Sequence, residues 1–274
     1  MNGFETSFKM NAYLFGCIIL MFFWTLSLIF LKFKRLDKDV REFWWASISC
    51  FLLGFSEPLF VPEYWDPPSI LKFYRWDFES FIFCFAVGGV ASVIVELPWV
   101  RKIVRTIVYE TGYYIWRFLR AIALIFGSQF LKDPVTKAPS SIFRNKTDWN
   151  EKRLLRFENM LLITFFLAIF GTTSHFKLNI IYDAAIVCVA TAFFIWWRRP
   201  ELKWQIFGGG IAFTIIYTLV LIIVGFYDPK FYDHWNHCAL SGKWFAGAPV
   251  EEYLFSFTFG AFWAPLYEAW KNEI

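Results

Sequence analysis

Residues 248–255 read APVEEYLF and place two adjacent carboxylates, Glu251 and Glu252, at the start of a long apolar segment. Pro249 stands just before them, where proline suits the first turn of a helix. Carboxyl groups at the edge of a membrane span are costly unless they have a function. A weaker version of this pattern, DFESFIF at residues 77–83, lies 172 positions earlier. The two stretches indicate a duplicated membrane protein whose acidic groups meet in one site.

The composition of the chain is that of an integral membrane protein. Hydrophobic residues make up 58% and aromatic residues 23% of its 274 residues, while only 18% are charged. A soluble domain of this length would carry more charge and fewer aromatic side chains. Residues 12–31 and 205–227 contain no charged side chain, and each is long enough to cross a hydrocarbon core of about 30 Å. We therefore predict an all-α, polytopic transmembrane helix bundle in contact with the lipid bilayer.

The apolar segments predict about seven spans. They cover residues 12–31, 43–61, 79–99, 158–174, 179–197, 205–227 and 251–270. Lys and Arg concentrate in the loops after the first and fifth spans and in the long third connection, whereas the other loops are close to neutral. Basic loops usually face the cytoplasm, so the N-terminus is predicted outside and the C-terminus inside. The net charge of +4 follows from these loops, and it gives no reason to expect a nucleic-acid partner.

Three regions follow from this pattern. Residues 1–100 form a first membrane module of three spans, and residues 158–274 form a second module of four spans. The basic residues 101–157 are predicted to connect them on the cytoplasmic side or in the interface. Within that connection, residues 112–127 are apolar but include arginines. They fit an interfacial helix with snorkelling Arg side chains, or a partly inserted eighth segment.

An internal repeat relates the two modules. An alignment of residues 79–96 with residues 251–268 has several identities. The identical pairs are Glu79 with Glu251, Phe83 with Phe255, Phe85 with Phe257, Gly88 with Gly260, and Glu96 with Glu268. Ahead of each stretch, EPLF at 57–60 resembles DPKF at 228–231, and a tryptophan follows each of them. A parallel repeat requires the third and seventh spans to point the same way, as the loop charges predict.

The paired carboxylates suggest acid chemistry. Adjacent residues on a helix diverge by about 100°, so Glu251 and Glu252 cannot both face one spot. One is expected to face the bundle interior, and the other to orient it or to bind backbone. A carboxyl group in a water-poor site favours its neutral form and can donate a proton. The alternative is that these carboxylates only cap a helix and complement its dipole.

The aromatic residues around the acidic groups allow two interpretations. They form lipid-facing bulk and an interfacial belt, or they line a pocket whose ring faces stabilise a carbocation. In the second case the predicted substrate-binding set is Trp65, Trp235, Phe83 and Phe255, together with the acids Glu57 and Asp228. A proton donor beside such rings is what a non-redox cyclisation of an isoprenoid needs.

Metal and cofactor signals are weak. His234 and His237 are spaced as two ligands could be, but no clear third ligand accompanies them. Asp183 belongs to the acidic site or caps a helix. No flavin or nicotinamide fingerprint occurs, because Gly208-Gly209-Gly210 follows no strand and fits close helix packing instead. We predict no metal and no cofactor.

Residues 249–255, PVEEYLF, resemble the Pro-x-Glu-Glu motif of the lycopene cyclase domain, the integral-membrane type without flavin. That family comes as two related three-span modules, separate or fused, and the repeat here is similar to the fused form. The resemblance implies proton-initiated ring closure of a hydrophobic polyene by Glu251 and Glu252, without a cofactor. The first half lacks the Pro and the second Glu, so Glu79 and Asp77 would be its partner acids.

The leading hypothesis is therefore a lycopene cyclase-like intramolecular lyase or isomerase of carotenoid biosynthesis. It would be a multi-pass protein, expected in a prokaryotic cytoplasmic membrane. One alternative is a proton- or ion-coupled transporter, in which the acids bind the coupling ion. The other is a membrane binding protein without catalysis.

Overall fold

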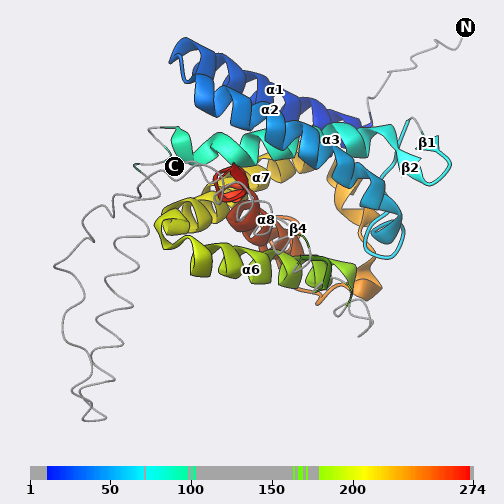
Figure 1. Ribbon diagram of the computed structural model, residues 1–274. Helices are drawn as coiled ribbons and strands as arrows, with labels where there is room; N and C mark the ends of the chain where they lie inside the picture. Colours follow the sequence, from blue (N-terminus) through cyan, green and yellow to red (C-terminus); the bar gives the residue numbers. More distant parts are fainter. Residues whose placement is uncertain are drawn as a thin grey trace, which may run out of the picture.

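The computed structural model describes residues 11–70, 72–97 and 179–271, and the single positions 100, 102, 163, 166–168 and 171. The chain is mostly helical in these parts (Figure 1). Apart from position 102, the predicted connection 101–157, including residues 112–127, lies outside the described residues, and so does most of the predicted span 158–174. We call residues 11–97 the first half and residues 179–271 the second half.

The first half packs three helices together. They are α1 (Ala12–Phe33), α2 (Asp37–Phe51) and α3 (Phe78–Val93), and α3 lies against both of the others. The 3₁₀ helix η1 (Leu52–Leu59) continues α2, and the 3₁₀ turn η2 (Ile94–Glu96) follows α3. Two short strands, β1 (Lys72–Phe73) and β2 (Trp76–Asp77), form an antiparallel hairpin that leads directly into α3.

The second half has the same order of elements. Helix α8 (Val250–Trp263) packs against α6 (Ile180–Arg198) and α7 (Lys203–Tyr227). The hairpin of β3 (Trp244–Phe245) and β4 (Ala248–Pro249) leads directly into α8. The shorter elements are η3 (Pro200–Leu202), η4 (Pro229–His234), η5 (His237–Ala239) and α9 (Leu266–Lys271). Strands β1 and β2 and the start of α3 precede β3, β4 and α8 by 172 residues, the offset of the sequence alignment.

Each half fixes its first helix to the loop ahead of its hairpin through an asparagine. Asn11 caps α1 by accepting from the Tyr13 amide, and its side-chain amide donates to the Pro68 carbonyl. Asn179 caps α6 in the same way, and its side-chain amide donates to the Ala239 carbonyl at 2.5 Å. The cap satisfies an amide that the helix leaves free, so one residue type starts the helix and also positions the loop.

Glycines let α3 and α8 approach their neighbours closely. A Cβ on Gly88 of α3 would stand 2.2 Å from Cys50 Cβ and 2.7 Å from the Ala46 carbonyl oxygen. A Cβ on Gly260 of α8 would stand 2.5 Å from the Gly209 carbonyl oxygen. Neither space accommodates a methyl group, because real Cβ atoms do not approach backbone this closely. Small residues at helix contacts allow this kind of backbone packing in membrane bundles.

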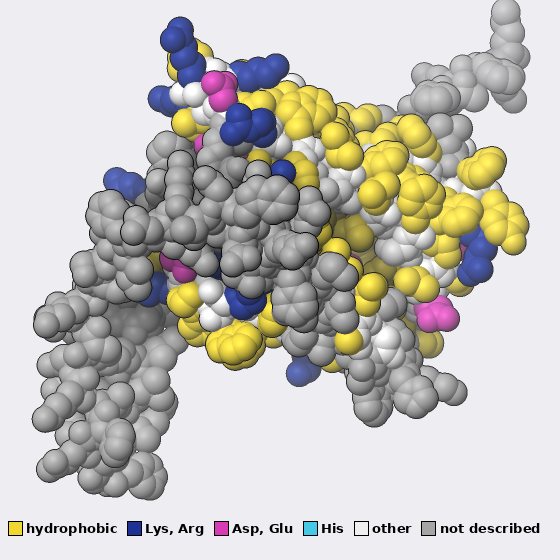
Figure 2. Space-filling view, viewed as in Figure 1, with side chains coloured by type: hydrophobic (Ala, Val, Ile, Leu, Met, Phe, Trp, Pro, Cys, Tyr) yellow, Lys and Arg dark blue, Asp and Glu magenta, His cyan; other side chains and the backbone are white. Residues whose placement is uncertain are grey.

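The outer surface of the helices supports membrane association. Helix α1, helix α6 and the segment Pro200–Tyr227 are long and apolar enough to cross a membrane, and α3 is a shorter apolar helix. A stripe of exposed apolar side chains runs along α1, comprising Ile18, Phe22, Leu26, Ile29 and Phe33. On the face shown in Figure 2, hydrophobic side chains form much of the surface of the described residues, and Lys and Arg gather where α1 ends. Such a stripe suits contact with lipid.

The predicted second and seventh spans are interrupted helices. The segment 43–61 is divided between α2 and the 3₁₀ helix η1, which contains Pro58. The segment 251–270 is divided between α8 and α9, with Pro265 in the break. Proline removes a backbone donor and clashes with the preceding turn. Because these two helices are interrupted, the number of seven spans and the orientation derived from it stay a prediction.

Candidate functional site

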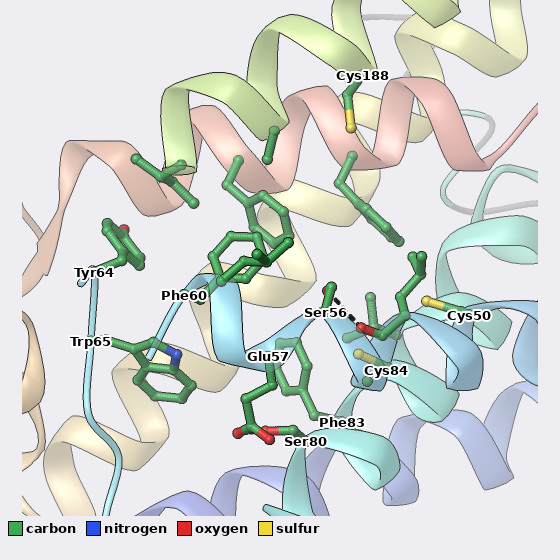
Figure 3. Close-up of a pocket in the computed structure, with 18 of the residues that line it drawn as sticks. Cys50, Ser56, Glu57, Phe60, Tyr64, Trp65, Ser80, Phe83, Cys84 and Cys188 are labelled. Atoms are coloured by element: carbon green, nitrogen blue, oxygen red, sulfur yellow. Dashed lines mark hydrogen bonds between the residues drawn. The ribbon is translucent and has the colours of Figure 1, made fainter. Parts of the chain in front are cut away.

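A cavity of about 380 Å³ lies between the two halves, and Phe166 and Leu167 add to its wall (Figure 3). The first half contributes residues of η1, the start of α3 and Tyr13 of α1 to its wall. The second half contributes one side of α6, Tyr217 of α7, Trp235, and the inner side of α8. The lining is largely apolar, and Glu57 and Glu252 are its two carboxyl groups among the described residues.

Glu252 lies on the cavity wall with a complete set of hydrogen-bond donors. It is buried, with 4% of its surface exposed. Its Oε1 accepts from the Tyr64 hydroxyl at 2.7 Å and from the Trp235 indole at 2.9 Å. Its Oε2 accepts from the Tyr217 hydroxyl at 2.8 Å. Since Tyr64 belongs to the first half, the surroundings of this carboxyl group require both halves.

The donors around Glu252 are all neutral. Within the described parts of the chain, no Lys, Arg or His forms an ion pair with it. Burial, followed by the charge of Glu252, raises the pKa of the Tyr64 hydroxyl, so that hydroxyl remains a donor. Oε1 uses both lone pairs, whereas Oε2 keeps one. A proton on Oε2 therefore preserves all three bonds, and the same donors stabilise the carboxylate after the proton leaves.

Glu251 points to a different place, as the helical divergence of the pair predicts. Its Oε1 accepts from the Ser241 amide at 2.7 Å and from the Tyr182 hydroxyl of α6 at 2.8 Å. Its Oε2 is buried with no hydrogen-bond partner among the described residues. Glu251 is not part of the cavity lining. Its contacts position the loop ahead of β3 against α6.

Glu79 has the corresponding position in the first half and binds the corresponding loop. Its carboxylate accepts from the Ser69 hydroxyl and from the Ile70 amide, each at 2.8 Å. Ser69 lies 172 residues before Ser241, so both carboxylates bind the same part of the loop ahead of a hairpin. Glu79 is buried and is not part of the cavity lining.

Asp77 and Glu57 are linked through the backbone. Asp77 is buried outside the cavity lining, and burial raises the pKa of its carboxyl group. Its amide donates to Glu57 Oε2 at 2.6 Å, and the Ser80 hydroxyl donates to Glu57 Oε1. Tyr13 and Ser80 share a hydrogen bond of 2.8 Å between their hydroxyl groups. Figure 3 shows the Glu57 carboxylate at the Ser80 side chain.

The aromatic residues of the predicted substrate-binding set lie on the cavity wall. Trp65, Trp235, Phe83 and Phe255 all line it. The rings of Trp65 and Trp235 are 5.6 Å apart and come from the two halves. Asp228 lies outside the lining, and it caps η4 by accepting from the Lys230 amide at 3.3 Å.

The two loops that carry these tryptophans pair through their backbones. Trp65 and Trp235 form an antiparallel bridge. The Asp66 amide donates to the His234 carbonyl at 2.8 Å, and the Asn236 amide donates to the Tyr64 carbonyl at 2.9 Å. Tyr64, next to Trp65, is thereby held at Glu252. We call residues 64–66 and 234–236 the loop clasp.

The remaining candidates are separate from the cavity. Asp183 is buried on α6, with Oδ1 unpartnered among the described residues and outside the lining. His237 stacks on Trp244 at 5.3 Å, and His234 packs on Phe231. The described residues hold no cluster of three or more metal-ligating side chains.

The sequence prediction omitted the hydroxyl groups that surround the acids. Tyr64 and Tyr217 donate to Glu252. Tyr13 bonds the Ser80 hydroxyl, which donates to Glu57. Tyrosines are common in this chain, so their type alone does not distinguish them. One usable signal was that Ser80 stands 172 residues before Glu252, where a second acid would be expected.

Comparison with known proteins gives one family. No curated protein and no solved structure matches the chain. The family model described as Lycopene cyclase matches residues 179–270, which run from the cap of α6 through α8 into α9 and include Glu252. The match supports a carotenoid cyclase-like function, an isomerase-type activity and membrane association. The match over residues 179–270 thus supports a domain of the lycopene cyclase family in the second half of this chain.

Proposed function

We propose that the protein is a membrane-embedded cyclase that closes a ring at one end of a lycopene-like polyene by proton transfer, without redox chemistry. The observation that carries this proposal is the position of Glu252, a buried carboxyl group on the wall of an apolar cavity. The cavity falls within the roughly 300–1,000 Å³ typical of small-molecule sites. Both halves would lie in the bilayer as related modules of a parallel repeat.

The chemistry assigns a role to each part of the cavity. Glu252 protonates one carbon of a terminal C=C bond, and its three donors stabilise the resulting carboxylate. The cation that forms is attacked by the π electrons of a second C=C bond, which closes the ring. Aromatic faces on the wall, among them Trp65 and Phe83, stabilise the positive charge. Loss of a proton from a neighbouring carbon then restores a C=C bond, so the product is an isomer of the substrate.

The other predicted acids have supporting roles in this proposal. Glu251 and Glu79 hold the loops ahead of the two hairpins. These contacts fix the first turns of α8 and α3, from which Glu252 and Ser80 reach the cavity. Glu251 and Glu79 are therefore positioning residues.

Expression in a bacterial host that accumulates lycopene tests the function. Cyclisation leaves fewer C=C bonds conjugated in one plane. The absorption maximum should therefore move to shorter wavelength, and the pigment should change from red towards yellow-orange. Chromatography and mass spectrometry should show a product with the mass of the substrate and one or two rings. An unchanged polyene, with the protein present in the membrane fraction, would contradict a lycopene cyclase. Proton-driven uptake of a solute without a new product would favour the transporter.

Tyr64→Phe tests the contribution of the first half to the acid. It removes one donor to Glu252 and keeps the ring that fills the space. A hydrogen bond to a charged group contributes about 1.5–3 kcal/mol, so the rate of ring closure should fall roughly 10- to 100-fold. The measurement is product formed per unit of membrane-bound protein. The matched control is Tyr253→Phe, whose hydroxyl bonds the Phe245 carbonyl outside the cavity, and it should retain full activity. Equal rates for the two variants would contradict the role of Tyr64.

A further inference from the structure

We propose that Glu57 is the second reacting carboxyl group of the cavity and removes the proton that ends ring closure. This inference rests on the proposed cyclase function and assigns its proton acceptor. Glu57 lines the same cavity as Glu252 but comes from the other half. Glu79 and Asp77, the partner acids that the sequence predicts, lie outside the lining.

In the first half, the carboxyl group of the cavity comes from a different element than it does in the second half. Ser80 occupies the place that corresponds to Glu252, at the same distance from its hairpin. The Ser80 hydroxyl donates to Glu57, which reaches this place from η1. A carboxylate therefore lies at the equivalent position in both halves. In the first half η1 supplies it, and in the second half α8 supplies it.

The contacts of Glu57 suit a base. The Asp77 amide and the Ser80 hydroxyl donate to different oxygens of the carboxylate. Each oxygen retains one lone pair, so either can accept a proton without losing a donor. These donors stabilise the carboxylate form that a base requires. The described residues place no cation on Glu57 that would compete for its charge.

The two carboxyl groups account for every proton and electron pair in the reaction. The O–H bond of Glu252 breaks as its proton forms a C–H bond with the terminal carbon, and Glu252 becomes a carboxylate. After the ring C–C bond has formed, Glu57 takes a proton from a carbon next to the cationic centre. The electrons of that C–H bond form the new C=C bond, and Glu57 becomes a neutral acid. Exchange with water returns a proton from Glu57 to Glu252 before the next turnover.

Glu57→Gln separates this role from a structural one. A Gln side chain can accept from the Asp77 amide and donate to Ser80, so the contacts of η1 with α3 are preserved. It cannot accept a proton from a carbon acid. With lycopene as substrate, conversion per unit of protein should fall about 100-fold, and the remaining product should contain a changed ratio of ring double-bond isomers. A purely structural carboxylate predicts the wild-type rate and the wild-type isomer ratio.

A relocated carboxylate provides the second test. The double variant Glu57→Gln with Ser80→Glu places an acid on α3 at the position that corresponds to Glu252. It should recover the activity that Glu57→Gln loses. If the single variant does not accumulate, the double variant tests whether a carboxylate at this place accepts the proton. The inference is overturned if Glu57→Gln matches wild type in rate and isomers, or if the double variant accumulates without recovering. If the wild-type protein converts no polyene, the proposed function itself fails.

Discussion

Glu252→Gln should abolish ring closure while the protein remains in the membrane. An amide cannot transfer a proton to an alkene, and general acid catalysis contributes roughly 10²- to 10⁴-fold. Its NH₂ group would also face a hydroxyl or indole that now donates to Glu252. We therefore expect product formation at least about 100-fold below wild type, together with some loss of stability. The measurement is the ratio of cyclised to linear polyene at equal protein amounts.

Glu251→Gln is the matched control for that experiment. The two residues are adjacent on α8, but Glu251 lies outside the cavity and bonds the Ser241 amide and Tyr182. A Gln oxygen can accept both bonds, so the loop should stay in place. We expect an effect smaller than about tenfold. If Glu251→Gln removed activity and Glu252→Gln did not, the assignment of the acid would be wrong.

Gly260→Ala should destabilise the second half severely. The added Cβ would stand 2.5 Å from the Gly209 carbonyl oxygen and 2.7 Å from Phe213 Cβ. Neither neighbour is a flexible side-chain end, so α7 and α8 must separate. Overpacking of this kind costs about 1–3 kcal/mol or more. The expected result is a lower midpoint of thermal inactivation in detergent, and less protein in the membrane.

Two further glycines make the stability experiment specific. Gly88→Ala should have a comparable effect through α2, because its Cβ would stand 2.2 Å from Cys50 Cβ. Gly171→Ala, at a helical position, is the control, since no described residue beyond its own helical turn comes within 4 Å of the added Cβ. That variant should match or exceed wild-type stability, because Ala is the better helix former. Equal stability of Gly260→Ala and Gly171→Ala would contradict the close contact of α7 with α8.

Apolar segments without charge could be recognised from the sequence because hydrophobicity over a long window is a strong signal. Helices α1, α6 and α7 cover the predicted spans 12–31, 179–197 and 205–227 closely. The divergence of Glu251 and Glu252 also followed from helix geometry alone. The helix breaks near Pro58 and Pro265 were harder to place, because proline is tolerated inside some membrane helices.

The partners of the site could not be read from sequence spacing. Tyr64 and Glu252 are 188 residues apart, and only the packing of the two halves brings them together. From the sequence, Glu57 is predicted in the substrate-binding set and not among the catalytic acids. Its bond with Ser80 depends on how η1 turns back towards α3. The hairpins have strands of two residues each, which are too short to show an alternating pattern.

The loop clasp has a consequence for a chain divided into two polypeptides. Each fragment alone would present an unpaired backbone edge at Tyr64–Asp66 or at His234–Asn236, and such edges promote aggregation. The fragments would therefore have to be made together and would recover activity only on reassociation. Neither fragment would retain partial turnover, because the residues that line the cavity come from both halves.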